Sequence, residues 1–392
     1  MNNIYSVIKR GAEASGCAGV ALSEGGYDLT YDALFKRVEV VAGQLKSFGV
    51  SDIGRVVLYC GDCIDYVVAS LAILSVGGVV IPVPVSSSAR ELAEVIERVR
   101  AESILFDVAL RECDGDAFTA GSFLTKRLQF SPLSNGCVVE DMDNPAFIRF
   151  SSGTTGQSKG VLLTHKAIIE RTDLANAGLK ITKNDVVLWS LSMSYHFVVS
   201  ILLFLRCGAT IRLCYADFPL ALQQALSEGS GSFIYASPFH YDTMVKSRNF
   251  DPACMGGVRM AVCTAMKLTR QLADSFKAKF GFDLTEAYGI IEVGLPCISR
   301  AGQSASGSVG RLLPGYEMKL LDSDEAGIGE VCLRGAGMYS AYVSPYEIRE
   351  RDAWFYTGDL GWAVIILNYL IFWQRDNPIK NSKVLRNLLV RS

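Results

Sequence analysis

The sequence predicts an α/β fold of two lobes with largely parallel sheets, followed by a small antiparallel β unit. Strand-like and helix-like patterns alternate up to about residue 305, which is typical of βαβ units. Past Gly307 the pattern changes to short strands separated by turn residues. The chain has 392 residues, 50% of them apolar, which allows a large buried core divided between more than one unit.

The first lobe alternates between helices and strands. Thr30 is a good N-cap, apolar residues recur at helical spacing over 31–45, and Gly49 follows as a stop. The pattern then predicts, in order, a buried strand over 55–60, a helix over 65–76, an extended segment over 79–85, a helix over 90–102 and a strand over 103–106.

The second lobe repeats this alternation after a polar loop near 151–160. We expect a helix over 195–206, a strand over 210–214 and another strand before Tyr288. In the third unit, strands over 316–321 and 330–334 flank turn residues, so this segment reads as an antiparallel hairpin.

Charge, cysteine and hydropathy patterns exclude several classes of protein. The 38 basic and 40 acidic residues nearly balance and form no long run, so we expect no nucleic-acid partner. The 11 cysteines are scattered and no secretory signal precedes them, which favours free thiols in a cytoplasmic protein. The apolar stretches 197–205 and 362–373 are shorter than the roughly 20 residues that a membrane span needs.

The segment Phe150-Ser-Ser-Gly-Thr-Thr-Gly-Gln-Ser-Lys-Gly160 carries the clearest chemistry. Small hydroxyl residues and glycines let successive backbone N–H groups point at one anion, and Lys159 adds a positive charge. This combination suits a triphosphate. It is not a Walker A loop, because Lys159 lies only three residues after Gly156. By composition alone, a flexible polar loop is an equally good interpretation.

The whole string resembles the phosphate loop of the adenylate-forming superfamily, which includes acyl-CoA synthetases, luciferases and nonribosomal peptide adenylation domains. Further segments resemble that family's motifs in the same order, over about residues 25–362: 29–34, 75–83, Tyr288-Gly-Ile-Ile-Glu292, 307–315 and Tyr356-Thr-Gly-Asp-Leu360. The resemblance implies the N-terminal core of the adenylate-forming fold, with a third unit that is β-barrel-like.

The resemblance also implies ATP and Mg²⁺ as cofactors and assigns roles to residues. Lys159 and the hydroxyls of the loop would hold the phosphates, and Glu292 would bind Mg²⁺ with Thr155. Tyr288 would stack on adenine beside Gly289, and Asp359 would accept hydrogen bonds from the ribose. The remaining nucleotide-binding residues would be Ser151, Ser152, Gly153, Thr154, Gly156 and Arg375.

The substrate would be a carboxylic acid. Relatives that activate amino acids carry an Asp near the segment that corresponds to 194–200, and this segment has none, so a buried ammonium group would be left without a partner. His196 lies where acyl- and aryl-acid ligases often have a histidine, and we expect it to be catalytic and to line the acid pocket with Thr264 and Ala265. We therefore expect an acyl or aryl acid.

The sequence departs from the family pattern at two places. Ile291 replaces a threonine, which removes a hydroxyl expected at the AMP phosphate. After Trp362 the expected hinge is degenerate, with Gln374 in place of its glycine, and the lid domain with its lysine is missing from the chain. The domain division that follows is 1–170 for the first lobe with the phosphate loop, 171–305 for the second lobe with the acid pocket, 306–362 for the β unit and 363–392 for a hinge remnant.

The expected activity is that of an acid–thiol ligase. A carboxylate would attack the α-phosphorus of ATP to give an acyl-adenylate, and a thiol of CoA or of a carrier-protein phosphopantetheine would follow. Three interpretations stay open: a ligase whose lid comes from another chain or a longer parent protein, a nucleotide- and acid-binding protein that is weak or inactive as an enzyme, and a disrupted, poorly folded product.

Overall fold

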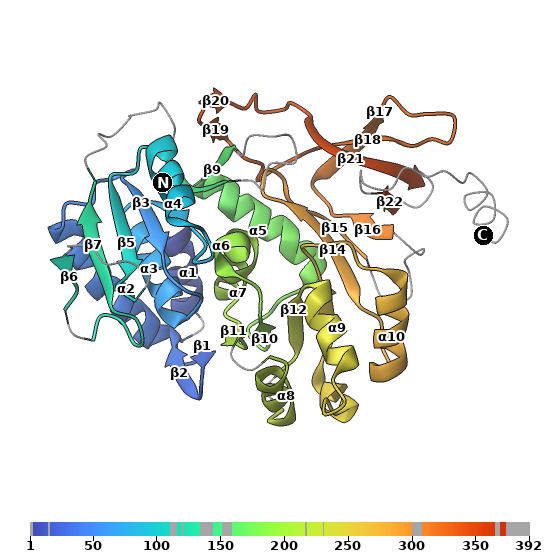
Figure 1. Cartoon of the computed structure of the whole chain (residues 1–392), viewed down its shortest axis with the longest axis horizontal. Coiled ribbons are helices and arrows are strands. Elements are labelled where there is room, and N and C mark those ends of the chain that lie inside the picture. Colours follow the sequence, from blue (N-terminus) through green and yellow to red (C-terminus); the bar gives the residue numbers. More distant parts are fainter. Residues whose placement is uncertain are drawn as a thin grey trace.

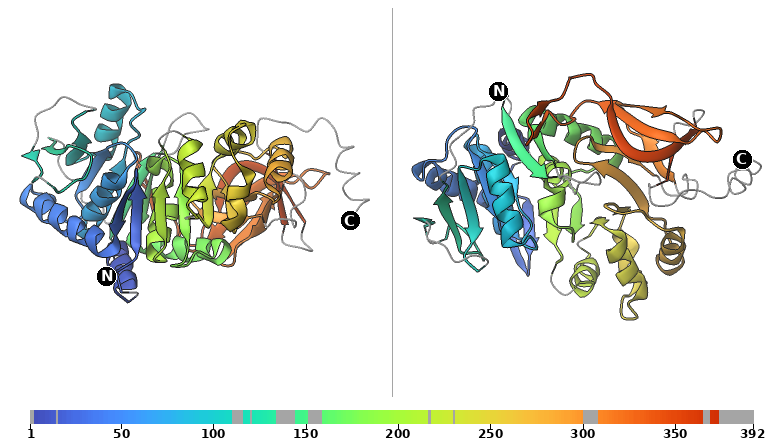
Figure 2. Two further views of the ribbon diagram at one scale, coloured as in Figure 1. Left: turned by 90° about the horizontal axis from the view of Figure 1, so that it is seen from below. Right: turned by 45° about the horizontal axis from the view of Figure 1, so that its top comes forward.

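The computed structural model describes residues 3–14, 16–109, 116–119, 121–133, 144–150, 159–215, 218–229, 231–299, 308–364 and 369–373. Two sheets with their helices form two neighbouring lobes, and antiparallel strands extend from the second (Figure 1). In the views of Figure 2 the blue-to-cyan lobe lies beside the green-to-yellow lobe, and most of the orange-to-red strands lie at the far side of the latter. This arrangement confirms the predicted fold class.

The first sheet has nine strands in the order β20-β19-β9-β8-β4-β3-β5-β7-β6. Its central pairs β4–β3, β3–β5 and β4–β8 are parallel, and the outer pairs are antiparallel. The strands are β3 Arg55–Tyr59, β4 Val79–Pro82, β5 Ser103–Asp107, β6 Asp116–Ala117, β7 Leu128–Pro132, β8 Pro145–Phe150, β9 Gly160–Thr164, β19 Ala341–Val343 and β20 Glu347–Ile348.

The second sheet has thirteen strands in the order β17-β18-β21-β22-β16-β15-β14-β13-β12-β10-β11-β1-β2. Its parallel part runs from β1 to β14, and the strands from β14 onward to β17 pair antiparallel. The strands are β1 Val20–Glu24, β2 Tyr27–Thr30, β10 Val186–Trp189, β11 Thr210–Leu213, β12 Phe233–Ala236, β13 Met260–Cys263, β14 Thr285–Ile290, β15 Gly294–Ile298, β16 Ser308–Leu312, β17 Tyr316–Leu321, β18 Gly329–Gly335, β21 Phe355–Val364 and β22 Tyr369–Trp373.

The helices cover the sheets and bury their apolar faces. They are α1 Ile4–Ala14, α2 Tyr31–Ser47, α3 Ile64–Ser75, α4 Ala89–Val99, α5 His165–Leu179, α6 Met193–His196, the π-helical turn η1 Phe197–Ile201, α7 Leu202–Arg206, α8 Leu220–Ser227, α9 Pro238–Lys246, the 3₁₀ turn η2 Pro252–Gly257 and α10 Arg270–Phe280. Residues 64–74 of α3 are all buried, which is the pattern of a helix covered on every side. One continuous core extends from α1 and α3 of the first lobe to β15 of the second.

Local sequence signals account for the helix ends. Thr30 caps α2, and its hydroxyl oxygen accepts a hydrogen bond from the Ala33 N–H at 3.3 Å, as predicted. Ser88 and Glu91 form a capping box at the start of α4. The predicted hairpin over 316–334 is confirmed as β17 and β18.

One prediction about an element differs from the structure. The helix expected over 195–206 is instead α6, the wider turn η1 and α7, an insertion of the kind often found at functional sites. Each sheet also contains strands from distant parts of the chain. Strand β1 pairs with β11 of the second sheet and β2 pairs with β1, while β19 pairs with β9 of the first, because strands far apart in the chain pair where the crossovers bring them.

The segment after Trp362 contributes a strand. Residues 369–373, which the sequence assigns to a degenerate hinge, form β22 between β21 and β16. In the described part of the chain no helix is long and apolar enough to cross a membrane.

Candidate functional site

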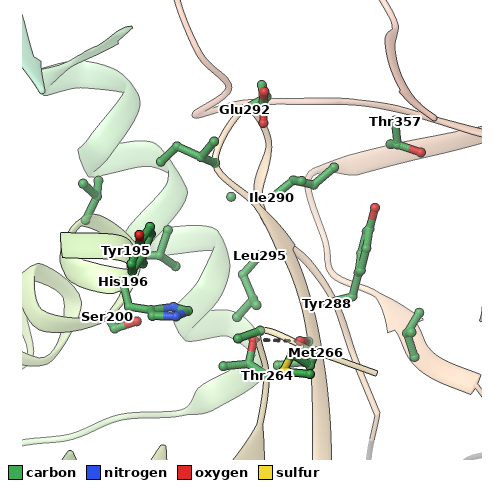
Figure 3. Close-up of a pocket in the computed structure, with 18 of the residues that line it drawn as sticks. Tyr195, His196, Ser200, Thr264, Met266, Tyr288, Ile290, Glu292, Leu295 and Thr357 are labelled. Atoms are coloured by element: carbon green, nitrogen blue, oxygen red, sulfur yellow. Dashed lines mark hydrogen bonds between the residues drawn. The ribbon is translucent and has the colours of Figure 1, made fainter. Parts of the chain in front are cut away.

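A cavity of about 680 Å³ lies where the two lobes and the antiparallel strands meet. Figure 3 shows side chains from α6, η1, the loop after β13, strand β14 and strand β21 facing this space. The structure thus brings together every predicted site residue that it describes: Lys159, His196, Thr264, Ala265, Tyr288, Gly289, Glu292 and Asp359. The other predicted residues, Ser151, Ser152, Gly153, Thr154, Thr155, Gly156 and Arg375, lie outside the described residues.

Strand β14 supplies the central wall of the cavity. Residues two apart on a strand share a face, so Glu286 and Tyr288 point to the same side. The Tyr288 hydroxyl donates a hydrogen bond to Asp359 Oδ2 on β21 at 2.8 Å. Burial raises the pKa of the Asp359 carboxyl, and this hydrogen bond opposes the rise.

Gly289 is required by the close approach of two strands. A Cβ atom at this position would lie 2.9 Å from the carbonyl oxygen of Gly294 on β15. Any side chain would therefore push β14 and β15 apart and move Tyr288, which precedes the glycine, and the turn that carries Glu292.

Glu292 lies in the turn between β14 and β15 and is 8% exposed. Burial raises the pKa of its carboxyl, and the positive charges of Arg149, Arg171 and Lys159 act against that rise. Its backbone carbonyl accepts a hydrogen bond from the Tyr339 N–H at 2.7 Å. This contact fixes the turn against the loop before β19.

Arg171 of α5 is fully buried and contacts the same turn between β14 and β15. Its Nε donates to the Gly337 carbonyl at 2.8 Å, and its Nη1 donates to the Ile291 carbonyl at 3.0 Å. Burial lowers the pKa of its guanidinium to about 10, so the side chain stays charged at neutral pH. Arg171 therefore holds together two loops that border the cavity.

Lys159 stands directly before β9, where the predicted phosphate loop ends. Its Nζ lies 4.4 Å from the ring centroid of Tyr342 on β19, a cation–π contact. Tyr342 in turn packs on Tyr339, with 4.7 Å between ring centroids. These aromatic rings keep the ammonium group at the cavity wall.

His196 ends α6, and its ring points into the cavity (Figure 3). The ring contacts Trp189 edge-on, with 6.3 Å between centroids. Burial, and secondarily the positive charge of Arg149, lowers the pKa of His196 to about 3. The imidazole is therefore neutral at physiological pH.

The loop after β13 forms the floor opposite His196. The Thr264 hydroxyl donates to the Ala287 carbonyl at 3.0 Å, which ties this loop to β14. Ala265 has φ 73°, an uncommon backbone conformation for alanine that turns the chain toward the cavity mouth. Met266 follows and is 66% exposed.

The sequence prediction omits several residues that line the cavity. Arg149 directly precedes the phosphate-loop string, and Glu286 shares a strand face with Tyr288, so sequence spacing could have revealed both. Burial raises the pKa of Glu286 to about 7. Tyr342 lies in the cavity only because β19 pairs with β9, for which no local signal exists.

Comparison with known proteins identifies the class to which this fold and site belong. The family model for AMP-binding enzymes matches residues 9–343. The chain therefore belongs to the AMP-binding enzymes of the adenylate-forming superfamily, a family that includes AMP-forming CoA ligases. This confirms the resemblance drawn from the sequence motifs.

The relatives found by sequence are longer proteins than this chain. The chain is 28% identical over 369 residues to 4-coumarate–CoA ligase-like 9 of Arabidopsis thaliana, covering 86% of this chain and 66% of that protein. It is 27% identical over 383 residues to naringenin synthase of Pestalotiopsis fici, covering 87% of this chain but 14% of that protein. The chain thus spans less than two thirds of the length of either relative.

Solved structures share the fold. Apo MatB from Rhodopseudomonas palustris matches with a TM-score of 0.82 at 20% identity, over 96% of this chain and 79% of MatB. The N-terminal domain of FACL13 from Mycobacterium tuberculosis matches with a TM-score of 0.79 at 19% identity, over 96% of this chain and all of that domain. The chain therefore corresponds to the N-terminal domain of the adenylate-forming fold.

Proposed function

We propose that this protein activates an acyl or aryl carboxylic acid with ATP. A carboxylate oxygen attacks the α-phosphorus, the bond to the β-phosphate oxygen breaks, and acyl-adenylate and pyrophosphate result. The observation that carries this proposal is that one cavity holds a lysine, a buried glutamate, a tyrosine–aspartate pair and a neutral histidine from distant parts of the chain. Catalysis of this kind depends mainly on positioning and charge neutralisation.

The nucleotide side of the site is formed by β14 and β21. The face of Tyr288 is suited to stacking on adenine, and its hydrogen bond to Asp359 at 2.8 Å sets the carboxylate beside the ring. Asp359 would accept hydrogen bonds from the ribose hydroxyls. The bare backbone of Gly289 leaves room for the base.

Lys159 and Glu292 would hold the phosphates and their Mg²⁺. A carboxylate oxygen is a ligand that Mg²⁺ prefers, and the burial that raises the pKa of Glu292 would be offset by a divalent cation. Thr155 and the other hydroxyls of the loop would complete this part of the site. When bound, the metal would neutralise charge on the phosphates.

The acid side is formed by His196, Thr264 and Ala265. Residues 194–200 contain no carboxylate that could pair with an ammonium group. Glu286 also lines the cavity, and we assign it to the nucleotide side because it shares a strand face with Tyr288 and accepts a hydrogen bond from the Leu268 N–H at 3.3 Å. An acid without an amino group fits best, and the similarity to 4-coumarate–CoA ligases favours an aryl acid.

The acyl-adenylate would then react with a thiol, either of CoA or of a carrier-protein phosphopantetheine. In other members of the family this step uses a lid domain. For this chain such a lid would come from a longer parent protein or from another chain.

The test is ATP/pyrophosphate exchange on the purified protein, alone and with a related lid domain added in trans. The acids would be 4-coumarate, benzoate, anthranilate and octanoate. Exchange that requires one of these acids and is lost in Glu292→Gln supports the proposal. Exchange with none of them under either condition, in a protein that still binds ATP, contradicts it.

A second candidate is a protein that binds nucleotide and acid without turnover. Ile291 favours it, because this residue lines the cavity beside Glu292 and offers no hydroxyl to the AMP phosphate. Loss of one neutral hydrogen bond costs about 0.5–1.5 kcal/mol, which slows adenylation without abolishing it. Ile291→Thr would then raise the rate of exchange over wild type if turnover occurs, and would leave a silent protein silent if binding is the only function.

A further inference from the structure

Arg149 has no role in the site described so far, although it lines the cavity. It lies near the end of β8, directly before the phosphate-loop string that begins at Phe150. Strand β8 pairs with β9, so Arg149 stands opposite Val161 and close to the start of β9, where Lys159 is placed. The side chain is therefore at the junction between the phosphate side and the acid side.

Among the described residues, Tyr195 holds one edge of the Arg149 guanidinium in place. Its Nη1 donates a hydrogen bond to the Tyr195 carbonyl, and its Cζ lies 5.5 Å from the centroid of the Tyr195 ring. Its Nε is buried and, among the described residues, has no hydrogen-bond partner. Leaving a buried donor unsatisfied is unfavourable, so this edge is suited to an acceptor that the described residues do not supply.

The charges around the acid side call for a cation. His196 is neutral at physiological pH and so supplies no positive charge to the acid side. A substrate carboxylate buried here would be costly without a positive partner. The positive charge of Arg149 is close enough to His196 and Glu292 to act on the pKa of both.

We propose that Arg149 binds the carboxylate of the acid substrate through its Nε edge and orients one carboxylate oxygen toward the α-phosphorus. The Nε edge of a guanidinium matches the two oxygens of a carboxylate, and this pairing fixes direction as well as charge. The inference rests on the proposed function and adds a substrate-binding residue to it. It also makes the charged carboxylate, and not the acyl or aryl group, the first determinant of what this site accepts.

The test measures equilibrium binding of matched acids and amides, which does not depend on turnover. The probes are 4-coumarate and 4-coumaramide, benzoate and benzamide, and octanoate and octanamide, each titrated by calorimetry. The variants are Arg149→Met and Arg149→Lys. The matched control is Arg98→Met. The Arg98 Cζ lies 4.7 Å from the ring centroid of Phe150, which follows Arg149 on β8, and Arg98 does not line the cavity.

We expect wild type to bind at least one acid more tightly than its amide. Arg149→Met should lower the affinity for that acid about tenfold to hundredfold and have little effect on the affinity for the amide. Arg149→Lys should restore part of the preference, and Arg98→Met should leave it intact. The proposal is contradicted by a wild-type protein without any preference for carboxylate, by an unchanged preference in Arg149→Met, or by an equal loss of acid and ATP binding in that variant. A carboxylate preference that depends on Arg149 in a protein without pyrophosphate exchange would uphold this inference while the proposed function fails.

Discussion

Burial determines the charge of the titratable side chains around the cavity. His196 is kept neutral and the carboxyls of Glu286, Glu292 and Asp359 have raised pKa values, because each loses contact with water. Arg149, Arg171 and Lys159 oppose this effect at Glu292. A site that combines buried carboxyls with nearby cationic side chains is suited to bind a polyanion together with a metal cation. The shifted pKa values also make the unfolding free energy of the protein depend on pH.

The neutral state of His196 predicts a stability loss in acid. In the unfolded chain its pKa is about 6.5, whereas in the folded protein it is about 3, so below pH 6.5 the unfolded state binds the extra proton. Wild type should therefore lose up to about 1.4 kcal/mol of unfolding free energy per pH unit through this group as pH falls from 6.5 toward 3. His196→Asn should lose less over the same window.

Urea unfolding of both proteins between pH 7 and pH 4 measures this difference. His165, whose pKa is also lowered, is present in both and cancels from the comparison. Parallel pH profiles for wild type and His196→Asn would show that His196 is not held neutral by the fold.

Lys159 provides the positive charge that the sequence assigns to the phosphates. We expect Lys159→Ala to reduce ATP affinity at least about tenfold, because a charge-assisted contact of this kind contributes roughly 1.5–3 kcal/mol. Ligand binding raises the thermal midpoint, so the variant should need correspondingly more ATP for the same shift. The control is Lys166→Ala, since Lys166 lies on α5 as an exposed residue paired with Glu170. Equal ATP responses in wild type and Lys159→Ala would refute the assignment.

At the scale of elements, β14, β15 and β16 build the wall that carries Tyr288 and Glu292. Close approach of these strands explains Gly310 in the motif over 307–315. Gly310 has φ 98°, and a Cβ atom there would lie 2.0 Å from the Ile298 carbonyl oxygen of β15. No side chain fits without moving the strand.

Gly310→Ala should therefore destabilise the protein more than a change at another glycine with positive φ. Gly281, which ends α10 at φ 83°, has no atom within 4 Å of an added Cβ and serves as the control. We expect Gly310→Ala to cost about 1–3 kcal/mol more than Gly281→Ala, because overpacking adds to the shared backbone strain. Equal unfolding free energies for the two variants would mean that β15 and β16 are less closely packed than the structure shows.

Sequence patterns predict most of these elements because their signals are local. Thr30, Ser88 and Gly281 sit at helix ends, and the apolar runs of β3 and β5 mark buried strands. The wider turn η1 has no such signal, since five apolar-rich residues fit an α-helix equally well. The pairing of β1 with β11 and of β19 with β9 depends on contacts between distant segments, which no local pattern encodes.

At the scale of the whole molecule, the cavity exists only because both lobes and the antiparallel strands meet. Arg149 comes from the first sheet, His196 from the helices of the second lobe, and Asp359 from β21. Motif resemblance predicts His196, Glu292 and Asp359 because each lies within a recognisable string. Arg171 and Tyr342 are found only from the structure, because their contributions depend on packing: Arg171 holds the Ile291 and Gly337 carbonyls, and Tyr342 faces Lys159.

The central claim is that this cavity joins a carboxylic acid to AMP, and the most direct measurement detects the acyl-adenylate itself. The protein would be incubated with ATP, Mg²⁺ and each of the four acids, with a lid domain added in trans, and the bound products would be identified by mass spectrometry. We expect an acyl-adenylate whose mass follows the acid supplied and which is missing from Lys159→Ala and Glu292→Gln. A protein that binds ATP and acid but forms no adenylate with any acid would contradict the claim.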